Sequence, residues 1–251
     1  MHLKVLACEI AKRELQYVAA RSRNEVEFEF LPQGYHDNPG SGRLQIQRRI
    51  DAVNKGRYDA IVLSYGLCGK ILVDLQCEHT KLVIPKAHDC ITLFLGSKER
   101  YQKCFSERPG TYYFTSGWLE CVTRQRDKAM TWSGAASPAN SGPNLQATYN
   151  EWVQTYGEDQ AKYLLEEMSR WTESYSHGCL IDFDFLNPLN LAGKVQQICS
   201  KKGWSYDQVP GDLSLFQAML DGPWPDEKFL VLQPGQKVVA SFDRQIIRAQ
   251  G

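Results

Sequence analysis

Three cysteines and a histidine stand directly after hydrophobic runs of this sequence, and thiol and imidazole groups bind metals or act as nucleophiles. Cys8 ends the run LKVLAC, Cys68 follows AIVL in the stretch YDAIVLSYGLCGK, and His88 and Cys90 follow LVIP. Thiolate and imidazole suit tetrahedral zinc, and three thiolates also suit an iron–sulfur cluster. We therefore predict a metal site of Cys8, Cys68 and Cys90, with zinc or an iron–sulfur cluster as cofactor, where His88 ligates the metal or moves a proton.

Gly66 and Gly69 bracket Cys68 and allow a tight turn that leaves its thiol at the end of a strand. The backbone amides of this loop, with Lys70 beside them, could instead bind an anion. A lone G-x-x-G-K lacks the spacing and the Ser or Thr of a nucleotide-binding P-loop. Both glycines are included in the predicted binding site.

The hydrophobic runs have the length and composition of buried strands, and amphipathic stretches separate them. We expect strands over 3–8, 26–31, 59–64, 82–85 and 111–115, and helices over 10–23, 43–55 and 91–107, with a break at Gly96–Ser97. Five such units predict an α/β fold with a Rossmann-like parallel sheet and helices on both faces. The carboxyl ends of parallel strands share one edge, which would bring the three cysteines together.

The second half of the chain predicts a smaller α/β lobe, so we divide the chain into residues 1–125 and 126–251. A low-complexity loop over Thr131–Pro143 is a candidate lid, and 145–171 is mostly helical. Strands are then expected over 178–183 and 204–209, helices over 191–202 and 213–220, and a terminal hairpin or edge pair over 229–232 and 237–242.

The composition restricts the partners. Lys and Arg together number 29, as do Asp and Glu, so the net charge of zero argues against nucleic acid or an anionic membrane as the partner. No apolar stretch reaches the ~20 residues of a membrane span, and the N-terminus lacks a signal-peptide layout. We expect a cytoplasmic protein whose eight cysteines are thiols or metal ligands, and whose partner is a small molecule or another protein.

Five stretches of the chain resemble a family of uncharacterised proteins from anaerobic bacteria and methanogenic archaea: YDAIVLSYGLCG, LVIPKAHDCITLFLGS, GTYYFTSGW, GDLSLFQAML and FLVLQPGQ. The resemblance extends over nearly the whole chain. It implies that Cys68, His88 and Cys90 are site residues, with Cys8 at the first strand end. It also implies a link to methyl or one-carbon metabolism, because members accompany corrinoid-dependent methyltransferase systems. Lys70 stands where the YGLCGN pattern has Asn, which puts a ligand contact at that position in doubt.

These observations favour a metal-binding α/β protein that acts on a small molecule, and whether it is an enzyme stays open. One alternative is a non-enzymatic accessory or metal-delivery protein for a corrinoid methyltransferase system. Another is a metal-free enzyme with two thiols, similar to aspartate/glutamate racemases, in which Cys68 and Cys179, the latter within SHGC beside His177, face one substrate.

Overall fold

The computed structural model describes residues 1–35, 39–127, 153, 157–160, 162, 175–241 and 243–251, and these form two compact units. The first unit comprises Met1–Lys103 and Gly211–Gly251, and the second comprises Cys104–Pro210. The loop expected over Thr131–Pro143 lies outside the described residues, as does most of the helical stretch expected over 145–171.

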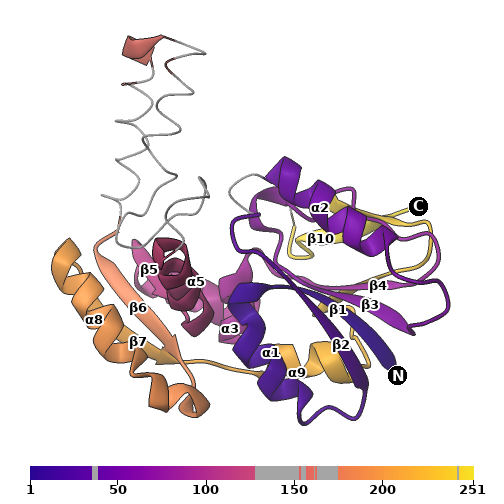
Figure 1. Cartoon of the computed structure of the whole chain (residues 1–251), viewed down its shortest axis with the longest axis horizontal. Helices are drawn as coiled ribbons and strands as arrows, with labels where there is room; N and C mark the ends of the chain where they lie inside the picture. The colour runs from indigo at the N-terminus through magenta and orange to yellow at the C-terminus, as the bar shows by residue number, and fades with distance from the viewer. Residues whose placement is uncertain (36–38, 128–152, 154–156, 161, 163–174, 242) are drawn as a thin grey trace. The chain divides into compact units, whose positions relative to one another are not determined.

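A five-stranded sheet forms the centre of the first unit (Figure 1). Its strands follow in the order β2 (Glu25–Leu31), β1 (His2–Cys8), β3 (Ala60–Ser64), β4 (Leu82–Pro85) and β8 (Phe229–Leu232). The first four are parallel, and β8 is antiparallel to β4. All five residues of β3 are buried, as expected for an apolar strand at the middle of a covered sheet. The α/β prediction is therefore confirmed at the level of a mostly parallel sheet with helices.

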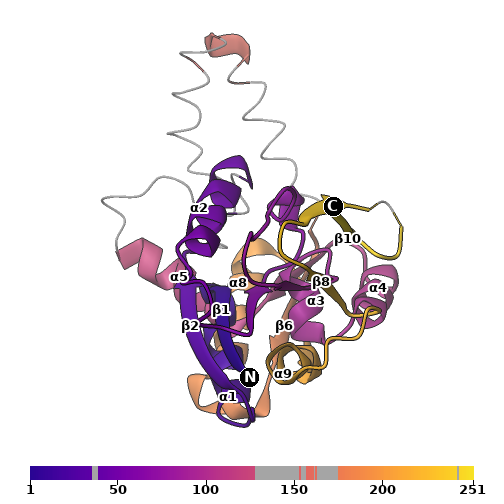
Figure 2. The ribbon, with the colours of Figure 1, turned by 90° about the vertical axis from the view of Figure 1, so that its right-hand side faces the viewer.

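Both faces of this sheet are covered (Figures 1 and 2). Helices α1 (Lys12–Ala19) and α9 (Ser214–Asp221) lie on one face, and α2 (Pro39–Asp51) lies on the other with β9 (Lys237–Ala240) and β10 (Ile247–Gln250). On the α2 side, Ile46 and Ile50 of the helix join buried residues of β3, β4 and β10 in one hydrophobic cluster. Burial of these side chains fixes the sheet and so the positions of its strand ends.

Short helical elements follow the carboxyl ends of β1, β3 and β4, where the three cysteines lie. A single turn of 3-10 helix, η1 (Glu9–Ala11), follows β1, and another, η2 (Cys68–Lys70), follows β3. Helix α3 (Cys90–Leu95) follows β4, and α4 (Lys98–Glu107) contains the boundary between the two units. The break expected at Gly96–Ser97 is present because Gly96 ends α3 in the left-handed conformation, with φ of 81°.

The second unit contains a separate parallel sheet in the order β5 (Thr111–Phe114), β6 (His177–Asp182) and β7 (Ser205–Pro210). Helix α5 (Ser116–Asp127) follows β5, while η3 (Asp184–Leu189) and α8 (Leu191–Lys202) connect β6 to β7. Helix α8 packs on β6 and β7. In the part of the chain that the structure describes, no helix is long and apolar enough to cross a membrane.

Two expectations about strand pairing were wrong. The strand expected to be fifth in the first sheet, β5, pairs instead with β6, and this pairing moves the boundary of the first unit to Lys103 rather than residue 125. The terminal hairpin or edge pair expected between 229–232 and 237–242 is also not formed by the described residues, because β8 pairs with β4 while β9 pairs with β10. The apolar side chains of β8 are buried beside β4, which returns the C-terminal segment to the first unit.

Candidate thiol site

The loops after β3 and β4 run side by side and are joined by backbone hydrogen bonds. Leu67 N–H donates to the carbonyl of Ala87 at 2.9 Å, and Cys68 N–H donates to the carbonyl of His88 at 2.9 Å. These bonds continue the pairing of the two parallel strands beyond their ends. They carry Cys68 on one loop toward Cys90 on the other.

Gly66 permits this close approach. A Cβ atom at this position would lie 2.5 Å from both the carbonyl carbon and Cα of Asp89. These are backbone atoms, which cannot rotate away as the tip of a flexible side chain could. The glycine is therefore required by the packing of one loop on the other, which explains why it precedes Cys68 in the sequence.

Cys68 adopts an unusual backbone conformation. Cys68, Gly69 and Lys70 have φ angles of 35°, 66° and 72°, so three consecutive residues lie in the left-handed region. For a residue with a side chain this region costs on the order of 1 kcal/mol, and such strain is concentrated at functional sites. The turn holds the thiol of Cys68 at the carboxyl end of β3, whereas Lys70 is exposed.

Cys90 is the first residue of α3, and Asp89 caps this helix. The Asp89 carboxylate accepts hydrogen bonds from the backbone N–H groups of Ile91 at 3.0 Å and Thr92 at 3.4 Å, and the Tyr101 hydroxyl donates to its Oδ2 at 2.8 Å. Burial raises the pKa of Asp89, and these donors oppose the rise. The cap fixes the start of α3 and therefore the position of the Cys90 thiol.

The Cys68 and Cys90 thiols influence each other's ionisation. A hydrogen bond with the Cys90 thiol lowers the pKa of Cys68, with the backbone N–H groups of Cys90 and Gly66 contributing in the same direction. The same bond raises the pKa of Cys90 well above its ordinary value, and burial adds to the rise. Cys68 is therefore the member of the pair that ionises first.

A cavity of about 280 Å³ lies against this pair within the first unit. All three predicted cysteines line it, and so do Gly66 and Gly69. Cys8 ends β1, and its charge contributes to the raised pKa of Cys90. The remaining lining residues are Ile10, Ala11, Tyr35, Ser64, Tyr65, Ile71, Asp89, Ile91 and Leu93. The structure thus brings together the three cysteines and both glycines that the sequence singled out.

His88 lies elsewhere. Its side chain is exposed and is not among the residues that line the cavity, although its charge lowers the pKa of the neighbouring Asp89. Across the described ranges, no three His, Cys, Asp or Glu side chains already form a group that would hold a metal ion.

Two residues that line the cavity were not predicted from the sequence as site residues. Ser64 and Tyr65, from the end of β3, are 0% and 4% exposed and line the cavity with the thiols. Burial raises the pKa of Tyr65 well above its ordinary value, and the nearby Cys8 adds to the rise. Their position in the sequence could have indicated them, because both stand between the buried run AIVL and the Cys68 loop.

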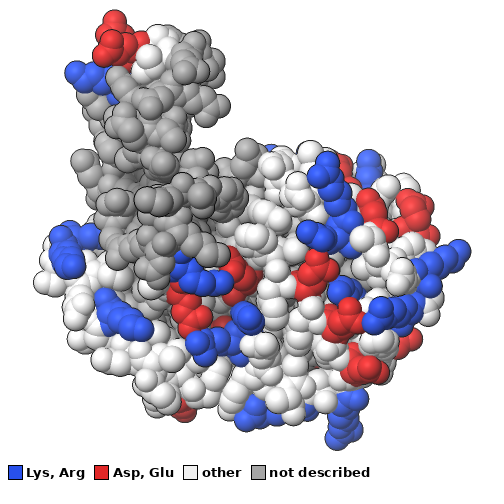
Figure 3. Space-filling model, in the orientation of Figure 1, with Lys and Arg blue, Asp and Glu red and all other residues white. Residues whose placement is uncertain are grey.

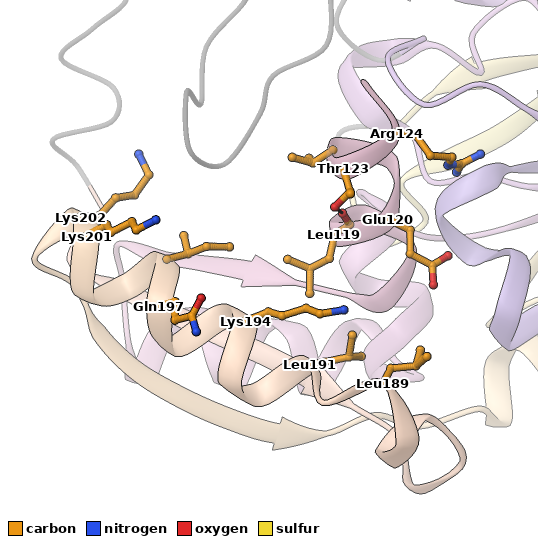
Figure 4. A pocket seen from close by; sticks show the side chains of 12 residues that line it. Leu119, Glu120, Thr123, Arg124, Leu189, Leu191, Lys194, Gln197, Lys201 and Lys202 are labelled. Carbon is orange, nitrogen blue, oxygen red and sulfur yellow. Dashed lines mark hydrogen bonds between the residues drawn. The ribbon is translucent and has the colours of Figure 1, made fainter. Parts of the chain in front are cut away.

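A larger cavity, about 570 Å³, lies in the second unit between α5 and α8 (Figure 4). It has a floor of Leu119, Leu189 and Leu191, and Lys194 of α8 extends across it. Two further lysines, Lys201 and Lys202, line its far end, but no cysteine lines it. On the face of the molecule drawn in Figure 3, acidic and basic side chains are interspersed. The thiol cavity is the better candidate site because nucleophilic groups converge on it.

Comparison with known proteins places the chain in a family but brings no function. Residues 30–220 match the family described as Protein of unknown function (DUF1638), and the chain belongs to this family. The match includes Cys68 and Cys90, whereas Cys8 precedes it. No curated protein and no solved structure matches the chain.

Proposed function

We propose that this DUF1638 protein binds a soft metal ion, either zinc or the iron of an iron–sulfur cluster, through Cys68 and Cys90, with Cys8 as the third sulfur ligand. The observation that carries the proposal is that Cys8, Cys68 and Cys90, from three separate strand ends, line one cavity, where the Cys90 thiol lowers the pKa of Cys68. A small molecule binds in the same cavity.

The chemistry of the two thiols supports this assignment. Two thiolates can bind one tetrahedral zinc, each at about 2.3 Å. The metal ion would take the place of the proton that Cys90 shares with Cys68. Because Cys68 already has a lowered pKa, little free energy is needed to provide the first thiolate.

Cys8 completes the set by approaching the pair. No complete three-ligand group is present in the described residues, so we propose that metal binding draws the Cys8 side chain toward Cys68 and Cys90. Cys8 ends β1, which pairs directly with β3, and its thiol lines the same cavity. His88 is not part of the proposed ligand set because its side chain is exposed.

The cavity favours a small molecule over a purely structural metal. Its lining is mostly apolar with a few polar groups, which is typical of small-molecule sites. We propose a cytoplasmic location, because free thiols persist in a reducing compartment. The link to one-carbon metabolism, and a corrinoid methyltransferase component as partner, stay predictions from the family resemblance.

The racemase-like alternative has less support. Cys179 belongs to the second unit, on β6, and burial raises the pKa of its thiol to about 12. A thiol with this pKa is protonated at neutral pH and is poorly suited to accept a proton.

Titration of the metal-free protein with Co²⁺ under anaerobic conditions tests the proposal. Thiolate-to-cobalt charge-transfer bands and the visible bands of tetrahedral cobalt should saturate at a stoichiometric ratio, and zinc should remove them. Cys68→Ser and Cys90→Ser should abolish the charge-transfer bands, and Cys8→Ser should weaken them. Cys104→Ser, at a partly exposed position on α4, is the control that should leave them unchanged.

Iron and acid-labile sulfide analysis of protein purified without oxygen distinguishes the two cofactors. Stoichiometric iron and sulfide with visible absorption would identify a cluster, and zinc alone would identify a mononuclear site. Folded protein that contains no metal after purification and gives no cobalt bands would refute both.

A further inference from the structure

Two residues that line the thiol cavity carry buried hydroxyl groups without a partner in the described part of the chain. Ser64 Oγ and Tyr65 Oη make no hydrogen bond with any described residue, although Ser64 is 0% and Tyr65 is 4% exposed. A buried polar group without a partner costs about 1–3 kcal/mol, so such groups are rare unless function requires them. Ser64 is the last residue of β3 and Tyr65 follows it, so they stand four and three positions before Cys68.

The remaining wall of the cavity defines what these hydroxyls would bind. Among the described residues, no Lys or Arg lines the cavity, so an anion would meet no countercharge from them. The carboxylate of Asp89 is already occupied by the Tyr101 hydroxyl and two backbone N–H groups. Ile10, Ile71 and Leu93 form apolar wall instead. These features select an uncharged molecule with a mostly apolar body.

The chemistry of the two hydroxyls selects an acceptor on that molecule. The Tyr65 phenol is protonated at neutral pH, as a phenol ordinarily is, and can donate a hydrogen bond. A serine hydroxyl can also donate, and a carbonyl oxygen has two lone pairs that accept. A cavity of about 280 Å³ lies at the small end of small-molecule sites, which excludes a ligand the size of a dinucleotide.

We propose that Ser64 and Tyr65 bind the carbonyl oxygen of a small, uncharged, mostly apolar substrate, and hold it against the Cys68–Cys90 thiols. This proposal rests on the function proposed above only in using the same cavity, because the two hydroxyls are not metal ligands. Ser64 and Tyr65 are positioning residues that orient the substrate.

Binding of cyclohexanone tests the inference, with methylcyclohexane as an apolar probe of similar size. Protein-observed NMR titration should show that the wild-type protein binds cyclohexanone more tightly than methylcyclohexane, with shifts confined to the thiol cavity. Tyr65→Phe should weaken cyclohexanone binding by about five- to tenfold, as expected for one lost hydrogen bond, and Ser64→Ala should also weaken it. Neither substitution should change the binding of methylcyclohexane.

Thr92 offers a matched control. Its hydroxyl is also buried and without a partner among the described residues, but Thr92 does not line the thiol cavity. Thr92→Val should therefore leave cyclohexanone binding unchanged. Equal binding of cyclohexanone by the wild type and Tyr65→Phe, or no binding by the wild type, would overturn the inference.

The cobalt spectrum separates this inference from the metal proposal. If the Tyr65→Phe protein keeps the thiolate-to-cobalt bands but binds cyclohexanone more weakly than the wild type, both proposals are supported. Hydroxyl-dependent cyclohexanone binding in a wild-type protein that gives no cobalt bands refutes the metal proposal alone. Cobalt bands with cyclohexanone binding that does not depend on either hydroxyl refute this inference alone.

Discussion

Replacement of Gly66 by alanine should disrupt the thiol site without removing any of its functional groups. The new Cβ would lie 2.5 Å from two backbone atoms of Asp89, so the loops after β3 and β4 must separate. Overpacking of this kind costs about 1–3 kcal/mol. Loss of the two hydrogen bonds that join the loops, from Leu67 to Ala87 and from Cys68 to His88, adds about 0.5–1.5 kcal/mol each.

We therefore expect Gly66→Ala to lower the free energy of unfolding by about 2–6 kcal/mol in urea denaturation. It should also raise the pKa of Cys68, because the thiol of Cys90 moves away. Gly56→Ala is the matched control, because Gly56 has a φ of +78° and its added Cβ would meet no other atom within 4 Å. This control should cost about 1–2 kcal/mol from backbone strain and leave Cys68 unchanged. A Gly66→Ala protein with wild-type stability and an unchanged Cys68 would show that the two loops are not in contact as described.

Three further predictions concern groups whose contacts are known. In metal-free protein, Cys90→Ala should move the midpoint of Cys68 alkylation by iodoacetamide to higher pH, measured by mass spectrometry, because the interaction that lowers the pKa of Cys68 is lost. An unchanged midpoint would contradict the interaction of the two thiols. Hydrogen bonds first from Tyr58 and then from Lys4 lower the pKa of Glu27 from 4.5 to about 2. The ionised Glu27 therefore stabilises the fold above pH 4.5, and this contribution is lost as the pH falls toward 2. In Glu27→Gln the free energy of unfolding should depend less steeply on pH in this range, and an equally steep dependence would argue against these bonds. Lys86, 5% exposed, donates to Asp226 and Gln245, so Lys86→Met should lower the free energy of unfolding by about 1–3 kcal/mol in urea, whereas a stabilised variant would contradict this role.

The positions of the cysteines were predictable because local patterns determine them. The run AIVL predicted β3, which spans Ala60–Ser64, and LVIP predicted β4 at Leu82–Pro85 as observed. Parallel pairing of neighbouring strands then places Cys8, Cys68 and Cys90 at one edge, and all three line one cavity. Hydrophobic runs and the rules of α/β topology are sufficient for this inference.

Pairing between distant segments was not predictable in the same way. The strand Phe229–Leu232 joins β4 although about 140 residues separate them in the sequence, and Thr111–Phe114 leaves the first sheet to pair with β6. A short apolar run carries no information about which edge it will join.

The wall of the site also depends on tertiary detail. A serine and a tyrosine after a buried strand are common, and only the packed structure shows that Ser64 and Tyr65 are buried at the cavity. His88 illustrates the reverse case. Its position next to Cys90 suggested a ligand, but its carbonyl accepts the Cys68 N–H while its side chain is exposed.

X-ray absorption spectroscopy of the zinc- or iron-loaded protein tests the central claim most directly. We predict sulfur scattering at about 2.3 Å, with two to three sulfur atoms per metal ion, that decreases by one sulfur in Cys68→Ser and in Cys90→Ser and is unchanged in Cys104→Ser. A first shell of only oxygen and nitrogen, or a sulfur shell that none of the Cys8, Cys68 and Cys90 substitutions alters, would contradict it.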